Sequence, residues 1–362
     1  MIHIAQRLHP FSHIPGAICP LPKSNWGIQA FPTRLVFRHL ITRQEIDLGI
    51  QCTGPMSDFT LQLDLEKGAV VLFGSAKEGY FRIFMTREMD GIALFFERAF
   101  SAGVTLVVGN QKQGCSIREK EKYLIPLPKE HPEISISQER LSLGMHKSQD
   151  WDMVARRADL KEIFPVWLRL GNCLPEQKVG GEKAGTLSLL SECKELLKER
   201  KIEEIFPAFQ KLFWAGFSGI MFPRLTDTQF QGLVLSDAPV SETLSPLLLL
   251  QEAAVLIRAL FYQERGDEIA FLPCLPPECH AGRFISIAAN CRDEIHMEWS
   301  KKLLRRIIWR PATDRKVSLL LQKPIKRFRL RRSLKERGKI INQPHLIEMQ
   351  KGQLYLLDNF ET

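Results

Sequence analysis

Residues 58–65 have the sequence Asp58-Phe59-Thr60-Leu61-Gln62-Leu63-Asp64-Leu65, in which polar and apolar side chains alternate with a period of two. Because successive side chains of a strand point to opposite faces, this segment predicts a strand with one buried and one wet face. Further short strands are indicated at Val70–Phe73, Phe81–Thr86, Ile92–Arg98 and Val104–Val108. Turn sequences containing glycine separate them. Short strands at this spacing predict an antiparallel β-sandwich, which we place at residues 34–138.

The segments next to this sandwich differ from it in composition. Residues 1–33 contain five prolines, and each proline ring fixes φ and disfavours helix in the residue before it. We therefore expect an extended Pro-rich arm there. Residues 139–171 are polar and predict a helical connector, with Asp150 as the N-cap of a helix. Residues 172–185 include Gly180-Gly181 and predict a flexible linker.

Helices and then a second β-domain are expected in the rest of the chain. Apolar residues recur at helical spacing in residues 186–265, which predicts a short helical segment. Its last helix has Ser245 as N-cap, an apolar body to Phe261 and Gly266 just past its end. Residues 266–362 predict a basic antiparallel β-domain, with strands at Arg283–Ala288, Glu294–Trp299, Leu303–Trp309, Val317–Leu321, Lys326–Leu330 and Gln353–Leu357. The predicted fold class is therefore α+β.

Length and composition narrow the class of protein. The chain has 362 residues, 44% of them apolar, which allows two or three packed domains. The longest apolar stretch, Leu247–Phe261, is shorter than the ~20 residues that cross a bilayer, and it contains charged residues. The N-terminus lacks the apolar run of a secretory signal. We expect no transmembrane segment and a cytoplasmic location, whereas the sequence does not indicate an oligomeric state.

The eight cysteines are scattered and form no Cys-x-x-Cys pair. Cys274, Cys279, His280 and Cys291 are close in sequence, but only the gap from Cys274 to Cys279 fits the spacing of zinc ligands. Free cysteines are commonly buried in protein cores, so we expect reduced thiols and no metal. The sequence also has no phosphate loop, dinucleotide fingerprint or nucleophile elbow, and we expect no cofactor.

Positive charge is concentrated near the C-terminus. Residues 301–339 contain sixteen lysines and arginines but only two acidic residues, within a net charge of +9 for the whole chain. Such clusters bind anionic partners such as nucleic acid, and the candidates are Lys326, Arg327, Arg329, Arg331 and Arg332. The alternative is a strand with a basic outer face, which also prevents edge-to-edge pairing. We favour this structural interpretation, because no nucleic-acid-binding motif accompanies the charge.

Two groups of titratable residues are candidates for acid–base catalysis, which needs such groups within hydrogen-bond reach of a substrate. The first group is His146, Asp150 and Asp152, and the second is Glu278 with His280. The alternative for the first group is a capped helix with surface ion pairs. Sequence spacing alone does not bring side chains together in a pocket, so the structural alternative is favoured.

One part of the chain carries a family resemblance. Its features are Gly266-Asp267-Glu268-Ile269, Leu272-Pro273-Cys274-Leu275-Pro276, Gly282 and Ile295-His296-Met297-Glu298-Trp299 before Leu303. With these features, residues 245–310 resemble the helix-to-sheet junction at the end of family 95 glycoside hydrolases, which are α-L-fucosidase-type enzymes. The resemblance implies a β-sandwich, a last helix, a small β-domain and a carbohydrate ligand.

The sequence departs from that family where catalysis would be expected. Leu247-Leu248-Leu249-Leu250-Gln251 takes the place of the family's Asp-Gly-Asn-Phe-Gly stretch, so no carboxylate is present there. Residues 186–265 are also too few for the family's helical barrel. Cleavage of a glycosidic bond ordinarily needs two carboxylates about 5–10 Å apart. The resemblance therefore predicts a non-catalytic, glycoside-hydrolase-like binding or scaffold protein with a carbohydrate partner. A glycosidase-like hydrolase with an unrecognised active site and a polyanion-binding protein are the alternatives.

Overall fold

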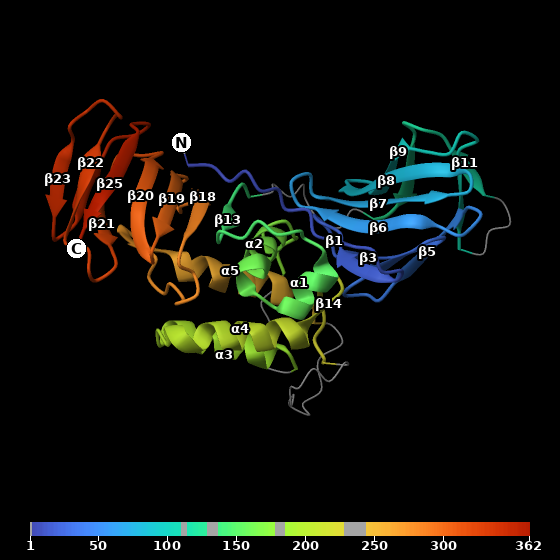
Figure 1. The fold of residues 1–362 in the computed structure, drawn as a ribbon, viewed down its shortest axis with the longest axis horizontal. Helices are drawn as coiled ribbons and strands as arrows, with labels where there is room; N and C mark the ends of the chain where they lie inside the picture. Colours follow the sequence, from blue (N-terminus) through green and yellow to red (C-terminus); the bar gives the residue numbers. More distant parts are fainter. Residues whose placement is uncertain (1, 110–113, 129–136, 178–184, 228–243) are drawn as a thin grey trace.

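The computed structural model describes residues 2–109, 114–128, 137–177, 185–227 and 244–362. The described chain is elongated, with β-sheets packed at both ends and five helices between them (Figure 1). This arrangement confirms the predicted α+β fold class, because the sheets at the N- and C-terminal ends are almost entirely antiparallel.

Two six-stranded antiparallel sheets form the N-terminal sandwich. The first sheet has the order β1 (Phe11–Ser12), β6 (Ser57–Asp64), β7 (Ala69–Ala76), β8 (Gly79–Glu88), β9 (Gly91–Arg98) and β12 (Lys122–Pro126). The second has the order β11 (Cys115–Ile117), β10 (Val104–Val108), β5 (Glu45–Gln51), β4 (Arg34–His39), β3 (Trp26–Phe31) and β2 (Ala17–Pro20). Leu61, Leu63 and Leu65 are completely buried in the sandwich core, as their alternation predicts.

The face of β6 that the alternation predicts to be wet is partly covered. Thr60 and Asp64 on this face are almost completely buried. The N-terminal residues run beside β6, because the Leu63 amide donates a hydrogen bond to the Pro10 carbonyl over 2.8 Å. Nε2 of His9 lies 3.1 Å from Oδ1 of Asp64. A segment distant in sequence therefore covers part of a surface that the local pattern assigns to solvent.

Residues 2–33 do not form an arm outside the sandwich. They supply β1 to the first sheet and β2 and β3 to the second, and Cys19, Leu21 and Trp26 are completely buried. The prediction of a separate arm is wrong for this part of the chain. Proline is tolerated on edge strands, and β2, which ends at Pro20, is the edge of its sheet. The sandwich therefore begins well before residue 34.

Five helices connect the two ends: α1 (Trp151–Arg157), α2 (Leu160–Gly171), α3 (Leu187–Lys198), α4 (Ile202–Gly216) and α5 (Leu247–Phe261). Asp150 caps α1 as predicted, because its side chain accepts hydrogen bonds from the amides of Asp152 and Met153. The predicted connector at residues 139–171 also contains the short strand β13 (Arg140–Ser142). Of the predicted linker, residues 178–184 lie outside the described residues.

The predicted helical segment also contains strands. A two-stranded sheet of β14 (Phe217–Ser218) and β15 (Phe222–Pro223) follows α4, and β16 (Tyr262–Arg265) follows α5 directly. The helix α5 begins after Pro246 rather than after Ser245. Gly266, which we expected next to the end of α5, has a φ of +61° in the turn after β16. The C-terminal β-domain therefore begins at Tyr262, four residues before the predicted boundary.

The C-terminal domain contains a seven-stranded and a four-stranded sheet. The larger has the order β13, β18 (Gly282–Ala288), β19 (Glu294–Ser300), β20 (Leu303–Arg310), β25 (Tyr355–Glu361), β22 (Arg327–Arg331) and β23 (Lys339–Asn342). The smaller has the order β16, β17 (Glu268–Phe271), β21 (Arg315–Leu320) and β24 (Leu346–Met349). All six strands predicted here are confirmed, although β17 and β21 run parallel.

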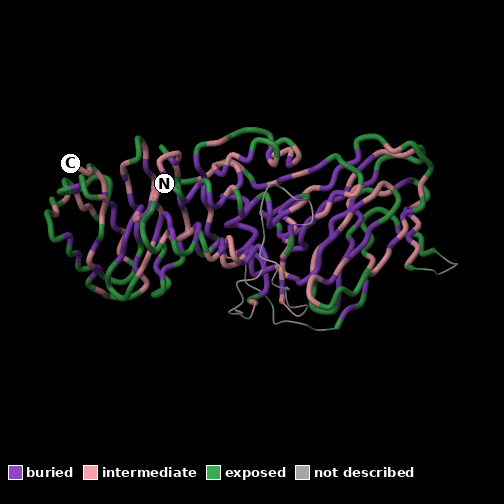
Figure 2. The backbone as a smooth tube through the Cα atoms, turned by 90° about the horizontal axis from the view of Figure 1, so that it is seen from below, coloured by how far each residue is buried: buried purple, intermediate pink, exposed green. Residues whose placement is uncertain are grey.

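The apolar cores of the parts are continuous. Buried residues follow the chain from the N-terminal sandwich through the helices to the C-terminal sheets (Figure 2). The helices α2 and α5 pack at the centre, where Gly171 lies against the backbone of Leu250. A Cβ atom on Gly171 would overlap the Leu250 carbonyl, so glycine allows this close approach.

Within the described ranges, none of the helices combines the length and apolar character that crossing a membrane requires.

Candidate functional site

The first group of predicted acid–base residues has structural roles or faces solvent. His146 is exposed. Asp150 caps α1, and Oδ2 of Asp152 accepts a hydrogen bond from the Ser12 hydroxyl over 2.7 Å. Both carboxylates therefore fix the start of α1 against β1. Neither of the two grooves described below is lined by any of these three residues.

Glu278 and His280 lie on the loop between β17 and β18. Oε2 of Glu278 is buried and has no hydrogen-bond partner among the described residues. His280 is exposed, and its backbone carbonyl accepts a hydrogen bond from the Lys302 amide over 2.8 Å. This pair is also absent from the lining of both grooves. The five predicted catalytic residues therefore come together in neither groove.

The predicted anion-binding residues on β22 are largely paired with carboxylates. Nε of Arg327 lies 2.6 Å from Oε2 of Glu361, and Nε of Arg329 lies 2.7 Å from Oδ1 of Asp358. Arg331 binds the second carboxylate oxygen of Asp358. Strand β22 therefore neutralises much of its positive charge against the neighbouring strand β25.

Two of the predicted anion-binding residues form no ion pair within the described chain. The side chains of Lys326 and Arg332 are exposed, and no ion pair involves them within the described chain. Burial alone would raise the pKa of Asp358, but the hydrogen bonds from Arg329 and Arg331 outweigh burial and lower that pKa. Nucleic-acid binding by this strand stays a prediction.

The cysteines are all free thiols. Cys274 and Cys279 are buried, whereas Cys291 is exposed. In the described part of the chain, no three side chains among histidine, cysteine, aspartate and glutamate are grouped so that they could hold a metal ion.

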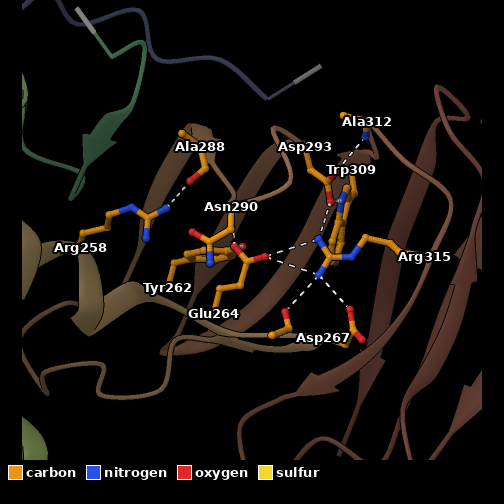
Figure 3. A network of polar contacts seen from close by, with 11 residues as sticks. Arg258, Tyr262, Glu264, Asp267, Ala288, Asn290, Asp293, Trp309, Ala312 and Arg315 are labelled. Atoms are coloured by element: carbon orange, nitrogen blue, oxygen red, sulfur yellow. Dashed lines mark hydrogen bonds and ion pairs between the residues drawn. The ribbon is translucent and has the colours of Figure 1, made fainter.

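A buried group of charges joins the two C-terminal sheets (Figure 3). Nη1 of Arg315 lies 3.4 Å from Oε1 of Glu264 and 3.3 Å from Oδ2 of Asp293, and all three side chains are nearly inaccessible. Asp293 also accepts hydrogen bonds from the Trp309 indole over 2.9 Å and from the Ala312 amide over 2.8 Å. Because each of its oxygens accepts a hydrogen bond, Asp293 has a structural role.

Glu264 is also held by hydrogen bonds, on the carboxylate oxygen that does not contact Arg315. Its Oε2 atom accepts hydrogen bonds from the Tyr262 hydroxyl over 3.1 Å and from the Asn290 amide over 2.9 Å. Burial first, and then the nearby Glu264 carboxylate, raise the pKa of Tyr262, so this hydroxyl stays protonated and donates. The sequence analysis did not predict this network, because no local pattern shows that charged residues from three separate segments are buried together.

The first groove lies on the outer face of the seven-stranded sheet, and we call it the basic groove. It is formed by β19, β20, β25, the end of β22 and the loop after β22, and its volume is about 640 Å³. Five cationic residues and two carboxylates line it: Arg306, Arg310, Arg331, Arg332, Lys335, Glu294 and Asp358. Of the predicted anion-binding residues, only Arg331 and Arg332 belong to it.

The second groove lies at the edge of the N-terminal sandwich, and we call it the aromatic groove. Its volume is about 740 Å³, and its lining includes three phenylalanines and four polar residues, namely Phe11, Phe59, Phe73, His13, Asp58, Thr60 and Gln62. These residues come from β1, β6, β7 and the segment after β1. The sequence analysis missed this site, because it placed residues 1–33 outside the sandwich.

The fold and the two grooves define an α+β protein with sheet domains at both ends, helices between them and an open groove on each sheet domain. Comparison with known protein families and with curated proteins finds no match for this chain.

Proposed function

We propose that the protein is a non-catalytic, glycoside-hydrolase-like binding protein, and that the aromatic groove binds a carbohydrate. The observation that carries this proposal is the combination of partly exposed phenyl rings and hydrogen-bonding side chains in one open groove. A sugar presents apolar C–H faces that pack against aromatic rings and hydroxyl groups that bind polar side chains. The aromatic groove provides both kinds of partner.

The phenyl rings of the groove are positioned by neighbouring side chains. Phe11 and Phe73 are half-buried, so each ring keeps an accessible part. The ring centroids of Phe11 and His13 are 5.1 Å apart, and Nδ1 of His13 lies 2.9 Å from the Thr60 hydroxyl oxygen. This contact orients the imidazole, and no partner for its Nε2 atom exists among the described residues. Nε2 is therefore available to a sugar hydroxyl.

A carboxylate is presented to the same groove by an irregular part of β6. The register of β6 against β7 shifts between Ser57 and Thr60, and Asp58 in this bulge has a φ of +55°. Bulges re-aim side chains and are common next to binding sites. A left-handed backbone conformation is also costly for a residue other than glycine. The exposed Asp58 carboxylate can accept hydrogen bonds from two sugar hydroxyls.

The roles of the remaining carboxylates support binding rather than hydrolysis. Asp150 and Asp152 are engaged at the start of α1, and within the described ranges Asp58 is the one carboxylate that lines the aromatic groove. Hydrolysis of a glycosidic bond ordinarily uses two. A cytoplasmic location is also part of this proposal, and the eight free thiols support it, because disulfides are rare in reducing compartments.

The test is a glycan array probed with the full-length protein, followed by titration calorimetry with the sugars that bind. We expect Phe73→Ala to weaken binding about fivefold, because it removes a stacking ring worth about 1 kcal/mol. Asp58→Asn should weaken it as well, because an amide offers one acceptor oxygen instead of two.

Phe95→Ala is the matched control. Phe95 lies on β9 of the same sheet, is 38% exposed and so more accessible than the half-buried Phe73, and does not line the groove. This variant should bind as the unmodified protein does. An array without a hit, or equal loss of affinity in Phe73→Ala and Phe95→Ala, would refute the proposal.

A further inference from the structure

The basic groove is built from aligned rows of side chains on the outer face of four neighbouring strands. In the central row, His296 of β19 is paired with Ile308 of β20, Ile308 with Leu356 of β25, and Leu356 with Arg331 of β22. The row therefore has two aliphatic residues in the middle and a polar residue at each end. Side chains paired across neighbouring strands are close enough to form one continuous surface.

The two neighbouring rows are charged. On one side of the central row, Arg306 is paired with Asp358. On the other side, Arg310 is paired with Glu294, and Nη1 of Arg310 lies 3.6 Å from Oε2 of Glu294. The apolar strip of Ile308 and Leu356 is thus enclosed by charged side chains along both of its edges. An apolar floor with a polar border is the usual construction of a ligand site.

The loop after β22 forms a wall of the groove and is held in place. Nη1 of Arg331 donates a hydrogen bond to the Leu334 carbonyl over 3.1 Å, and the Arg332 amide donates one to Oε2 of Glu336 over 2.6 Å. Gly338 has a φ of +79°, and a Cβ atom there would overlap the side chain of Arg331. The loop is therefore ordered against β22 before any ligand arrives, which reduces the entropy lost on binding.

The arginines on the strands of the groove are paired with carboxylates, whereas the cations of the loop that forms the wall are not. Arg306 is paired with Glu298 over 2.9 Å, Arg310 with Glu294, and Arg331 with Asp358. The side chains of Arg332 and Lys335 form no ion pair with the described residues, and both line the groove. Leu334 between them is 74% exposed. Two free cations and an exposed aliphatic side chain therefore face the same apolar floor.

We propose that the basic groove binds a small amphipathic anion, namely a ligand with an unbranched alkyl chain that ends in one carboxylate. The chain lies on the half-buried Ile308 and covers the exposed Leu334, which removes apolar surface from water, while the buried Leu356 closes the floor beneath it. The carboxylate is bound by Arg332 and Lys335. The site and its ligand are separate from the carbohydrate proposal, because the basic groove is lined by residues of the C-terminal domain and the aromatic groove by residues of the N-terminal sandwich. The sheets of these two parts lie at opposite ends of the molecule (Figure 1).

The composition of the groove favours this ligand over a nucleic acid. Single-stranded nucleic acids stack their bases on aromatic side chains, whereas the floor here is aliphatic and, among the residues that the structure describes, His296 is the one ring in the lining. That imidazole is held at both nitrogens, because Nδ1 accepts a hydrogen bond from the Ser286 amide over 3.2 Å and Nε2 lies 3.0 Å from Oε1 of Glu294. Its ring is therefore fixed as part of the border.

Titration calorimetry of the full-length protein with three probes separates the contribution of the alkyl chain to the affinity from that of the carboxylate charge. Octanoate has both the chain and the charge, octan-1-ol has the chain alone and acetate has the charge alone. We expect octanoate to bind about tenfold or more tightly than octan-1-ol, and acetate to give no measurable heat. The affinity for octanoate should also fall as the salt concentration rises. No binding of octanoate, equal binding of octanoate and octan-1-ol, or equal binding of octanoate and acetate would overturn the proposal.

Charge-reversal variants locate the site. Lys335→Glu and Arg332→Glu alter exposed side chains and should each weaken octanoate binding by about tenfold, with little change in octan-1-ol binding. Lys323→Glu is the matched control, because Lys323 is an exposed lysine of the same domain that does not line the groove. Equal losses in Lys335→Glu and Lys323→Glu would show general attraction by the basic domain and would refute the site.

Discussion

Nε of Arg258 donates a hydrogen bond to Oε1 of Glu139 over 2.9 Å, and this contact joins the last helix to the chain just before β13. The same carboxylate oxygen accepts a hydrogen bond from the Ala288 amide over 2.9 Å, at the end of β18. Asn172, at the end of α2, donates to the other oxygen over 3.3 Å. Glu139 therefore ties two helices to the C-terminal sheet.

Replacing Glu139 by glutamine should destabilise this junction. Glutamine keeps the shape but has one acceptor oxygen and no charge, so the Arg258 guanidinium loses its charged partner. We expect a loss of about 2 kcal/mol, since Arg258 is partly accessible to water. The measurement is the midpoint of urea unfolding. Glu195→Gln, at an exposed helix position paired with Lys198, is the control, and equal midpoints for the two variants would contradict this role.

The buried charges around Arg315 offer a second test. Arg315→Met removes the cation between Glu264 and Asp293 and leaves two buried carboxylates without it (Figure 3). Breaking a buried pair in this way costs about 3–5 kcal/mol. Lys316→Met, one residue further along β21, breaks only an exposed pair with Glu348 and should cost less than about 1 kcal/mol. Thermal unfolding of both variants checks this, and similar melting temperatures would count against the network.

Asp358 makes the stability of the C-terminal domain depend on pH. Its pKa is lowered in the folded state, so its contribution is present above the unfolded pKa of about 3.9 and is lost as the pH falls through the lower folded value. The melting temperature of Asp358→Asn should therefore lie below that of the unmodified protein at about pH 7. The difference should shrink below about pH 4, and a constant difference across this range would be inconsistent with the assignment.

Thiol reactivity tests the packing of the core. Burial raises the pKa of Cys173 to about 11 and the pKa of Cys193 and Cys279 to about 12. The thiolate is the reactive form, so these cysteines should resist alkylation in the folded protein. Cys115 and Cys291 are exposed and should react first. Mass spectrometry after brief labelling checks the order, with urea-denatured protein, in which all cysteines react, as the control. Early labelling of Cys193 or Cys279 would show that the core is open.

Local patterns were sufficient to predict part of the secondary structure, including eleven of the strands that the structure describes. The alternation at Glu294–Trp299 and the apolar body of Leu247–Phe261 correspond to β19 and α5, because side-chain periodicity depends only on backbone geometry. The same reasoning failed for residues 1–33. Proline positions report local φ but not whether a segment pairs with a distant edge, and β1 pairs with β6 about fifty residues later in the chain.

Candidate sites were predicted less well than the elements that carry them. Asp150 was correctly predicted as a helix cap, since capping is a local interaction between a side chain and the amides that follow it. Arg331 and Arg332 were noticed as part of a basic run, but the run also includes Arg327 and Arg329, which are neutralised by carboxylates on β25. Which cations remain free depends on strand neighbours, and sequence spacing does not contain that information.

The sequence by itself determined the fold class, the positions of some of the strands and helices, and the concentration of positive charge near the C-terminus. Only the tertiary structure decided which of these residues share a surface. The strand order β19–β20–β25–β22 aligns His296, Ile308, Leu356 and Arg331 in one row, although they span more than sixty positions of the chain. The physical reason is that periodicity arises from the geometry of one strand, whereas a groove arises from the pairing of several.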